Sequence, residues 1–276
     1  MRILTRRDTG LLTQWTFGTR AGDADALAFL NAASITDPTI TAAITNLVIA
    51  LKNYGIWTKM LAIYPFVGGT AVTHKFNLIN PLDTNAAFRL VFTGGWTFST
   101  NGATPNGVNA YADTFLTPST TMSVNSAHIS NYSRTQNIGV SGVQIGCFDG
   151  TNELSIYQYF AAISFKGGSL YSYPTDAVRF NNTNTLGFQI NTRTAINVAK
   201  LHFNGSILST NSTNRTTNLP SISLLLGASN RTSGIPTQYS PHQLAFASIG
   251  SGLTDTEAVN YNTAVVAFQT SLNRNV

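Results

Sequence analysis

The apolar positions of the chain follow two different periods, and the first of them is helical. Over residues 37–60, one set of apolar side chains recurs at spacings of three and four: Ile40, Ala43, Ile44, Leu47, Val48 and Leu51. That spacing predicts an amphipathic α-helix. Asp37 can cap this helix, Pro38 suits its first turn, and Gly55 can end it. A shorter helix is expected just before it, over residues 24–29.

From about residue 61 the pattern changes to short apolar or alternating runs separated by turn residues. The runs read LAIYPF, AAFRLVF, IGVSGVQIGCF, LSIYQYFAAISF, TLGFQI, NVAKLHF, SISLLLGAS and LAFASIG. Asn-Gly and Gly-Gly pairs stand between several of them, for example Asn101-Gly102. Many short strands with regular turn signals predict a β-sandwich or barrel. No internal repeat is evident, and no linker rich in Pro and Gly marks a second domain.

The clearest hairpin is predicted in VAKLHFNGSIL. Alternation places Leu201 and Phe203 on one side of its first strand and Lys200 on the other. The pair Asn204-Gly205 favours the positive φ angles of a type I′ turn.

A second strong helix signal stands near the end of the chain, over residues 252–272. Thr254 and Glu257 form a capping box, in which each side chain accepts a hydrogen bond from the other residue's backbone N–H. An apolar stripe with spacings of three and four follows: Ala258, Tyr261, Val265, Phe268 and Leu272. This helix is expected to pack on the predicted strands.

The composition indicates a folded chain with an unusually uncharged surface. Hydrophobic residues make up 43% of the chain, which is ordinary, but charged residues make up only 10%, against roughly 25% in typical soluble domains. Amide and hydroxyl side chains must therefore supply most of the polar surface. Such surfaces are common in proteins that contact other proteins or sugars.

The charge is uneven along the chain. The net charge is +5, and the first twenty residues hold a group of arginines: Arg2, Arg6, Arg7 and Arg20. We interpret residues 1–22 as an arm that docks on a polar or acidic partner; the alternative is an organelle transit peptide. Nucleic-acid binding would need a basic stripe with interleaved aromatic residues, so no nucleic-acid partner is expected.

The single cysteine and the lengths of the apolar runs limit the compartment. Cys147 stands alone, so a disulfide framework is excluded and a reducing compartment is favoured. Its apolar neighbours predict a small core residue. No apolar run reaches the roughly 18 residues that a membrane span needs, and no membrane partner is expected.

The segments KLHFNGSIL, LLLGASNRTSG and HQLAFASIGSGLTDTEAVNYNTAVVAFQ resemble the closing part of laminin-G-like, concanavalin A-like jelly rolls. The resemblance implies a mainly β protein with a concanavalin A-like antiparallel β-sandwich, an N-terminal helical segment and a C-terminal closing helix. In that arrangement the last helix packs across the end of the sandwich and covers a sheet edge or end.

The segments ALAFLNAASITDPTITAAITNLVIALKNYGIWTKMLAIYPFVGGTAVTHKFNL and AAFRLVFTGGWTFSTNGATPNGVNAYADT resemble virion-associated proteins of tailed bacteriophages. This resemblance implies a non-enzymatic structural protein of the tail, a fibre or the capsid surface. Its partners would be other virion proteins and copies of itself, with a trimer as in many fibres, in a particle assembled in the host bacterial cytoplasm. The expected organisation is an arm over 1–22, a helical segment over 23–60 and the sandwich over 61–276.

The residues that could carry catalysis are scattered. A glycosidase needs two carboxylates across a bond, but Asp149 and Glu153 fit a turn, and Glu257 belongs to the helix cap. The histidines show no spacing of metal ligands: His74, His128, His202 and His242. No loop has the density of oxygen ligands that calcium requires. We therefore expect no enzyme activity, no metal and no cofactor.

The sequence offers one candidate sugar site, over residues 94–114. Aromatic and amide side chains gather there around two Asn-Gly turns: Trp96, Phe98, Asn106, Asn109 and Tyr111. An aromatic platform with amide groups at its edge suits a host surface glycan, and carbohydrate binding is the alternative function. In the other interpretation, Trp96 and Phe98 alternate into the core. Trp57, beyond the first long helix, is expected to pack on the sandwich.

Overall fold

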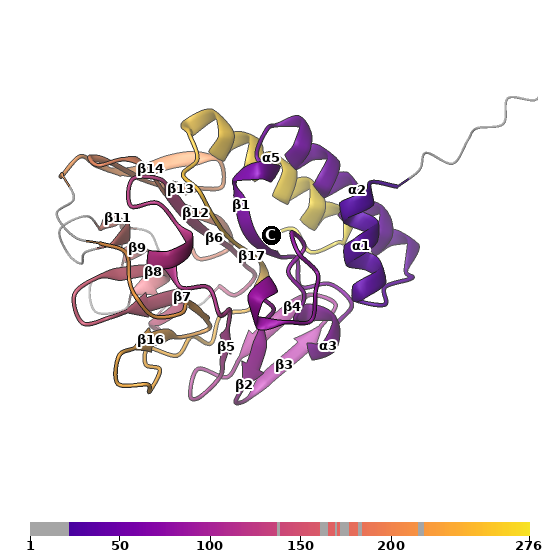
Figure 1. Ribbon diagram of the computed structural model, residues 1–276, viewed down its shortest axis with the longest axis horizontal. Coiled ribbons are helices and arrows are strands. Elements are labelled where there is room, and N and C mark those ends of the chain that lie inside the picture. Colours follow the sequence, from indigo (N-terminus) through magenta and orange to yellow (C-terminus); the bar gives the residue numbers. More distant parts are fainter. Residues whose placement is uncertain are drawn as a thin grey trace, which may run out of the picture.

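A computed structural model describes residues 22–136, 139–160, 165–168, 170–171, 177–181, 184–214 and 218–276; for 158–160, 165–168 and 170–171 it gives the strands but not the side chains. The chain is mainly β, with two sheets packed face to face and helices against one of them (Figure 1). Arg2, Arg6, Arg7 and Arg20 lie outside the described residues, so the predicted arm stays a prediction.

The first sheet, called sheet A, is antiparallel throughout. Its strands lie in the order β14 (Ser206–Asn211), β13 (Val198–Phe203), β12 (Gly187–Ala195), β6 (Ala127–Ser133), β17 (Leu244–Gly250), β4 (Gly102–Pro105) and β3 (Trp96–Ser99). Strand β1 (Met60–Tyr64) also pairs with β17.

The second sheet, called sheet B, is antiparallel with one parallel addition. Its strands lie in the order β11 (Val178–Phe180), β9 (Phe165–Gly168), β8 (Glu153–Phe160), β7 (Gly142–Phe148), β15 (Leu225–Leu226), β5 (Tyr111–Asp113) and β2 (Val91–Thr93). Strand β10 (Leu170–Tyr171) pairs with β8, and β16 (Ser229–Arg231) runs parallel to β7.

An apolar core fills much of the space between the two sheets. Sheet A contributes Ile129 and Leu201, and sheet B contributes Ile145, Cys147 and Ile156, all of them fully buried. The prediction that Cys147 is a core residue is therefore confirmed.

A helical layer covers the outer face of sheet A. It consists of α1 (Ala24–Ala32), α2 (Pro38–Asn53) and α5 (Asp255–Ser271), and Figure 1 shows α2 and α5 side by side. The connections hold the short helices α3 (Ala71–His74) and α4 (Pro118–Thr121) and the 3-10 turns η1 (Trp57–Lys59) and η2 (Asn85–Ala87). None of the helices in the described part of the chain is long and apolar enough to cross a membrane.

Helix α2 forms as its sequence predicts. The Asp37 carboxylate accepts a hydrogen bond of 2.9 Å from the Ile40 N–H, and Pro38 occupies the first turn. The predicted apolar face is buried from Ala43 to Leu51. Beyond the C-cap, Gly55 adopts a φ of 70°, a left-handed conformation that favours glycine.

Helix α5 begins with the predicted capping box, but it lies elsewhere than expected. The Glu257 N–H donates to the Thr254 hydroxyl, and the Thr254 N–H donates to the Glu257 carboxylate. Its stripe packs on the aromatic residues of central strands: the Tyr261 ring meets the Phe188 and Phe246 rings at 5.2 and 6.1 Å. The helix covers the face of sheet A rather than a sheet edge or end, because that face is itself apolar.

The predicted hairpin is confirmed as β13 and β14. Asn204 and Gly205 have φ angles of 48° and 81°, as a type I′ turn requires. Leu201 and Phe203 point into the space between the sheets, whereas Lys200 lies on the opposite face near α5. Together with the two sheets and both helical segments, this confirms the sandwich fold expected from the sequence.

Candidate functional site

The predicted sugar site comes together in space, but its amide groups serve the loop that carries them. The Asn106 side-chain oxygen Oδ1 accepts hydrogen bonds from the backbone N–H groups of Val108, Asn109 and Ala110 at 2.9, 3.0 and 3.2 Å. Its amide nitrogen donates to the Asn109 side-chain oxygen at 2.8 Å, which also accepts from the Gly95 N–H. These contacts fix the loop between β4 and β5.

Trp96 is likewise engaged in the fold. Its indole N–H donates to the carbonyls of Thr93 and Tyr111, both at 3.1 Å. Its half-buried ring packs edge-on to Phe92 at 5.2 Å and stacks near Phe98 at 6.3 Å, where the edges of sheets A and B meet. As a binding site this cluster stays a prediction, and it offers few unoccupied polar groups.

A second aromatic surface has more unoccupied groups, and we call it the Trp57 pocket. It is a shallow hollow of about 290 Å³ lined by Asp25, Lys52, Gly55, Trp57 and Thr58. Three elements build it: the first turn of α1, the last turn of α2, and η1. No atom lies within 4 Å of the position that a Cβ on Gly55 would occupy, so the turn after α2 leaves the pocket open at Gly55.

An ion-pair cluster forms the polar rim of the Trp57 pocket. The Lys52 ammonium lies 2.7 Å from an Asp23 oxygen and 2.6 Å from an Asp25 oxygen. Burial alone would raise the pKa of Asp23, but hydrogen bonds from Lys52 and from the N–H groups of Ala26 and Asp25 lower it. Burial opposes the charged form of Lys52 as well, yet its bonds to both aspartates raise its pKa. Asp23 and Lys52 are therefore both charged near neutral pH.

Trp57 supplies the apolar surface of the pocket. Its half-buried ring packs against the helical layer, and the Lys52 ammonium lies 5.4 Å from the ring centre. The indole N–H donates to no described residue, and the Thr58 hydroxyl has no partner among them either. An aromatic ring, two free donors and an ion pair thus line one hollow.

The sequence did not reveal this site. Trp57 was expected to pack on the sandwich; it is a partly buried member of the apolar cluster between sheet A and the helical layer, and part of it stays exposed. Lys52 and Asp23 are 29 residues apart and meet only because α1 and α2 pack together. A usable signal was present, since Trp57 stands two residues after Gly55, the glycine beyond the end of a helix that carries a lysine in its last turn.

Another hollow, of about 400 Å³, lies around Asp149 and is lined also by Ser119, Met122, Val124, Asn152, Asn218, Leu219 and Ser221. Asp149 holds the loops there. One of its oxygens accepts from the N–H groups of Thr151 and Asn152, and the other accepts from the Ser221 N–H at 3.0 Å. Burial alone would raise the pKa of Asp149, and these N–H groups lower it. The carboxylate therefore serves the fold.

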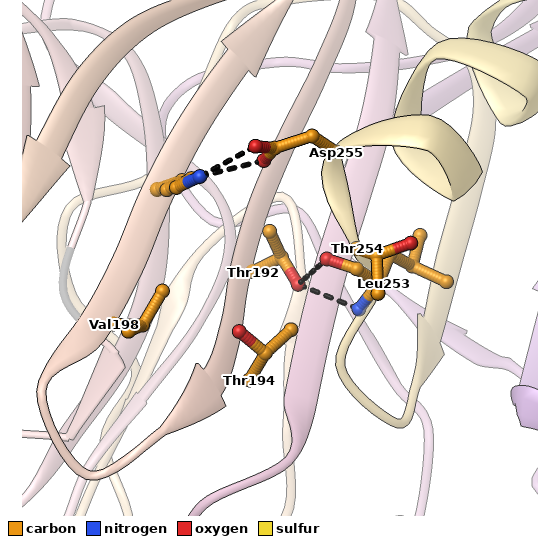
Figure 2. A pocket seen from close by; sticks show the side chains of 7 residues that line it. Thr192, Thr194, Val198, Leu253, Thr254 and Asp255 are labelled. Carbon is orange, nitrogen blue, oxygen red and sulfur yellow. Dashed lines mark hydrogen bonds and ion pairs between the residues drawn. The ribbon is translucent and has the colours of Figure 1, made fainter.

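A third hollow, of about 160 Å³, lies where α5 begins above sheet A (Figure 2). Figure 2 shows Thr192 exchanging two hydrogen bonds with the backbone of Leu253, at 2.8 and 3.2 Å. The Lys200 ammonium bonds to both Asp255 oxygens, at 2.6 and 2.8 Å. These contacts fasten α5 to sheet A.

The two glutamates, which a hydrolase could use, each have a structural role in the fold. Glu153 is only 5% exposed and accepts hydrogen bonds from Ser155 and Tyr157 at 2.9 and 3.0 Å. Glu257 completes the α5 cap and pairs with Lys59 at 2.6 Å. Within the described ranges, no group of three or more His, Cys, Asp or Glu side chains could hold a metal ion.

All four histidines are buried in the fold. His74, His128, His202 and His242 are each at most 1% exposed. His128 bonds to Ser248 and to the Ser251 carbonyl. His202 differs, because neither of its ring nitrogens makes a hydrogen bond to a described residue; the Asp255 carboxylate lies 3.6 Å from its Nε2.

No protein-family model matches the sequence, and no curated protein matches it either. Among solved structures, the chain is similar to botulinum neurotoxin type C, with 11% identity and a TM-score of 0.55. Cell entry of that neurotoxin depends on its interaction with two ganglioside molecules. The match covers 76% of this chain and 52% of that one. It is also similar to a mutant Trypanosoma rangeli sialidase with trans-sialidase activity, with 12% identity and a TM-score of 0.51, over 84% of this chain and 39% of that one.

Domain 4 of an extracellular arabinanase from Geobacillus stearothermophilus, in complex with arabinotriose, matches with 14% identity and a TM-score of 0.49, over 74% of this chain and 98% of that domain. The neurotoxin and the sialidase establish a shared β-sandwich fold. The chain spans about half the length of the neurotoxin chain and less of the sialidase chain.

Proposed function

We propose that the chain is a non-catalytic glycan-binding domain that holds its ligand at the Trp57 pocket. One observation carries the proposal. A partly exposed tryptophan, whose indole N–H donates to no described residue, lies beside the ion pair of Asp25 and Lys52 in a hollow open to solvent.

The chemistry of the pocket matches that of a sugar ring. The C–H face of a pyranose packs on an aromatic surface, and its hydroxyls both donate and accept hydrogen bonds at the rim. Asp25 can accept from such hydroxyls, while the Trp57 indole and the Thr58 hydroxyl can donate to them. Bonds to a charged group are the stronger ones, so Asp25 would orient the ring.

The comparisons support binding in a general way. The neurotoxin that shares this fold enters cells through interaction with gangliosides, and gangliosides carry glycans. At 11% identity this likeness is one of fold, so the choice of site rests on the residues of the Trp57 pocket.

The test compares the two half-exposed tryptophans. The full chain, Trp57→Ala and Trp96→Ala are applied to a glycan array, and affinities for the bound glycans are measured by calorimetry. We expect Trp57→Ala to weaken binding by about tenfold, equivalent to about 1.4 kcal/mol, because the sugar loses its apolar platform. Trp96→Ala should leave the affinity unchanged in protein that circular dichroism shows to be folded.

Two results would contradict the proposal. If the full chain binds no glycan, the function is wrong. If Trp96→Ala abolishes binding while Trp57→Ala does not, the ligand binds at the cluster of Trp96, Asn106, Asn109 and Tyr111 instead.

A virion location is a second proposal, which rests on the resemblance of residues 26–78 and 86–114 to virion-associated phage proteins. In it, the chain is a structural component of a phage particle, assembled in the host cytoplasm and anchored by its arginine-rich arm to other virion proteins and to copies of itself. Glycan binding would then contribute to adhesion at the host surface. Mass spectrometry of purified particles tests this proposal, and particles that lack the chain would refute it.

A further inference from the structure

We propose that the Trp57 pocket selects sugars that carry no carboxylate, so that its ligand is a neutral glycan. This inference rests on the proposed function and concerns the same site. It follows from how the charges of the pocket are distributed and from which of its donors are already occupied.

The charged groups of the pocket sum to a negative value. Two carboxylates, Asp23 and Asp25, share the single ammonium of Lys52 at 2.7 and 2.6 Å, which leaves a net charge of −1 at the rim. The nearest other lysine in sequence, Lys59, is paired with Glu257 at 2.6 Å. An acidic sugar at this rim would therefore meet uncompensated negative charge.

The donors of Lys52 are occupied. An ammonium has three donor hydrogens, and this one has contacts at 2.8 and 2.7 Å to the two Asp23 oxygens and at 2.6 Å to Asp25. A sugar carboxylate would have to break one of these contacts to gain an ion pair. The donors that remain, on Trp57 and Thr58, are neutral and suit hydroxyl oxygens.

The helix ends add to this selection. The pocket lies at the C-terminal end of α2, which is the negative end of the helix dipole. The positive end of α1 is not available to a ligand anion, because Asp23 already accepts from the N–H groups of Asp25 and Ala26. Both ends therefore disfavour an anion in the pocket.

The experiment uses the full chain and paired probes. The neutral probes are lactose, maltotriose and cellotriose, and the acidic probes are α2,3-sialyllactose, α2,6-sialyllactose and a galacturonic acid trimer. We expect the tightest neutral probe to bind at least about fivefold more tightly than every acidic probe at low salt. Added salt should lower this neutral-to-acidic affinity ratio, because it screens exposed charges.

Charge variants locate the cause of the preference. Asp25→Asn removes one rim charge and should lower the neutral-to-acidic ratio by about threefold or more. Asp255→Asn is the matched control: Asp255 is 49% exposed against 47% for Asp25, and each pairs with a lysine at 2.6 Å. Asp255 lines another hollow, so this variant should leave the ratio unchanged. Arg20→Gln is included because Arg20 lies close in sequence to Asp23, and loss of its charge should not weaken the preference.

The outcomes separate this inference from the proposed function. If an acidic probe binds as tightly as the neutral ones and Trp57→Ala abolishes that binding, the pocket binds glycans but the charge selection is wrong. If Asp25→Asn and Asp255→Asn change the ratio equally, or if Arg20→Gln removes it, the rim carboxylates are not its cause. If no probe and no other glycan binds, the proposed function fails and this inference with it.

Discussion

Arg274 shows how one buried side chain fixes the end of the chain. It is 1% exposed, and its guanidinium donates to the carbonyls of Phe66, Pro65 and Ala245 and to the Gln269 side chain at 2.8 to 3.1 Å. Burial lowers the pKa of Arg274 to about 9, so the group is still charged at neutral pH. Oxygen dipoles therefore stabilise the charge, and the same bonds join α5 to the chain beyond β1.

Arg274→Met should destabilise the protein by about 3 kcal/mol, because it leaves buried carbonyl oxygens without donors. Urea unfolding measures the loss. Arg89→Met is the control: the Arg89 side chain is 29% exposed and pairs with Asp83 at 3.2 Å, and such surface pairs contribute about 1 kcal/mol or less. Equal losses in the two variants would contradict this account of Arg274.

The buried histidines make the folded state sensitive to acid. Burial lowers the pKa of His128 to about 4, although its bond to the Ser251 carbonyl opposes the shift. Burial and the charge of Arg274 lower the pKa of His74 to about 3. Both groups are neutral when folded and bind protons more readily when unfolded, near the ordinary value of 6.5. Stability is therefore complete above that value and is lost as the pH falls through 6.5 toward 4 and 3.

We expect the unfolding free energy to fall by about 2 kcal/mol for each of these two histidines between neutral pH and about pH 5. Denaturant unfolding at both pH values measures the change. His128→Gln should remove about half of the pH dependence, whatever it costs in stability. An unfolding free energy that stays constant over this range would show that the histidines are already hydrated in the folded state.

At the scale of elements, the sequence predicted what local chemistry determines. The capping box of α5, the Asp37 cap of α2 and the turn at Asn204-Gly205 each depend on residues a few positions apart, and each is present. The face that α5 covers was not predictable in this way. It depends on Tyr132, Phe188 and Phe246, which come from three strands far apart in sequence.

The capping box allows a direct measurement of local stability. Thr254→Ala should cost about 1 kcal/mol, because the Glu257 N–H loses its acceptor. Thr256→Ala, also exposed and within the same turn, should change stability by a few tenths of a kcal/mol at most. Thermal unfolding of both variants measures their stability losses. Equal losses would show that the capping box does not stabilise α5.

The Trp57 pocket illustrates the limit of sequence reasoning at this scale. Its aromatic residue is visible in the sequence, but its rim arises when the last turn of α2 meets the first turn of α1. One sequence cannot show which of its lysines and aspartates pair. Residues 94–114 had the more evident combination of aromatic and amide groups, and those amides are used by the loop itself.

At the scale of the whole molecule, sheet A is buried on both faces at its central strands β6 and β17. Its inner face meets sheet B and its outer face meets the helical layer, so β6 is buried along its full length. Strand alternation predicted the layers, but not the polar groups between them. Gln189 and Asn191 are fully buried on the inner face and bond to each other at 3.1 Å. The side-chain amide of the buried Asn131 has no hydrogen-bond partner among the described residues. Because amide residues are common throughout this chain, the sequence could not show that these amides are buried.

The central claim is that this sandwich binds a glycan through Trp57. The chain contains three tryptophans, Trp15, Trp57 and Trp96, so the indole N–H region of a ¹H–¹⁵N correlation spectrum holds few signals, and Trp57→Phe assigns the decisive one. On titration with a neutral glycan, the Trp57 signal should shift and the Trp96 signal, bonded to two carbonyls, should not. A glycan that binds and shifts only the Trp96 signal, or glycans that shift no indole signal at all, would contradict the account.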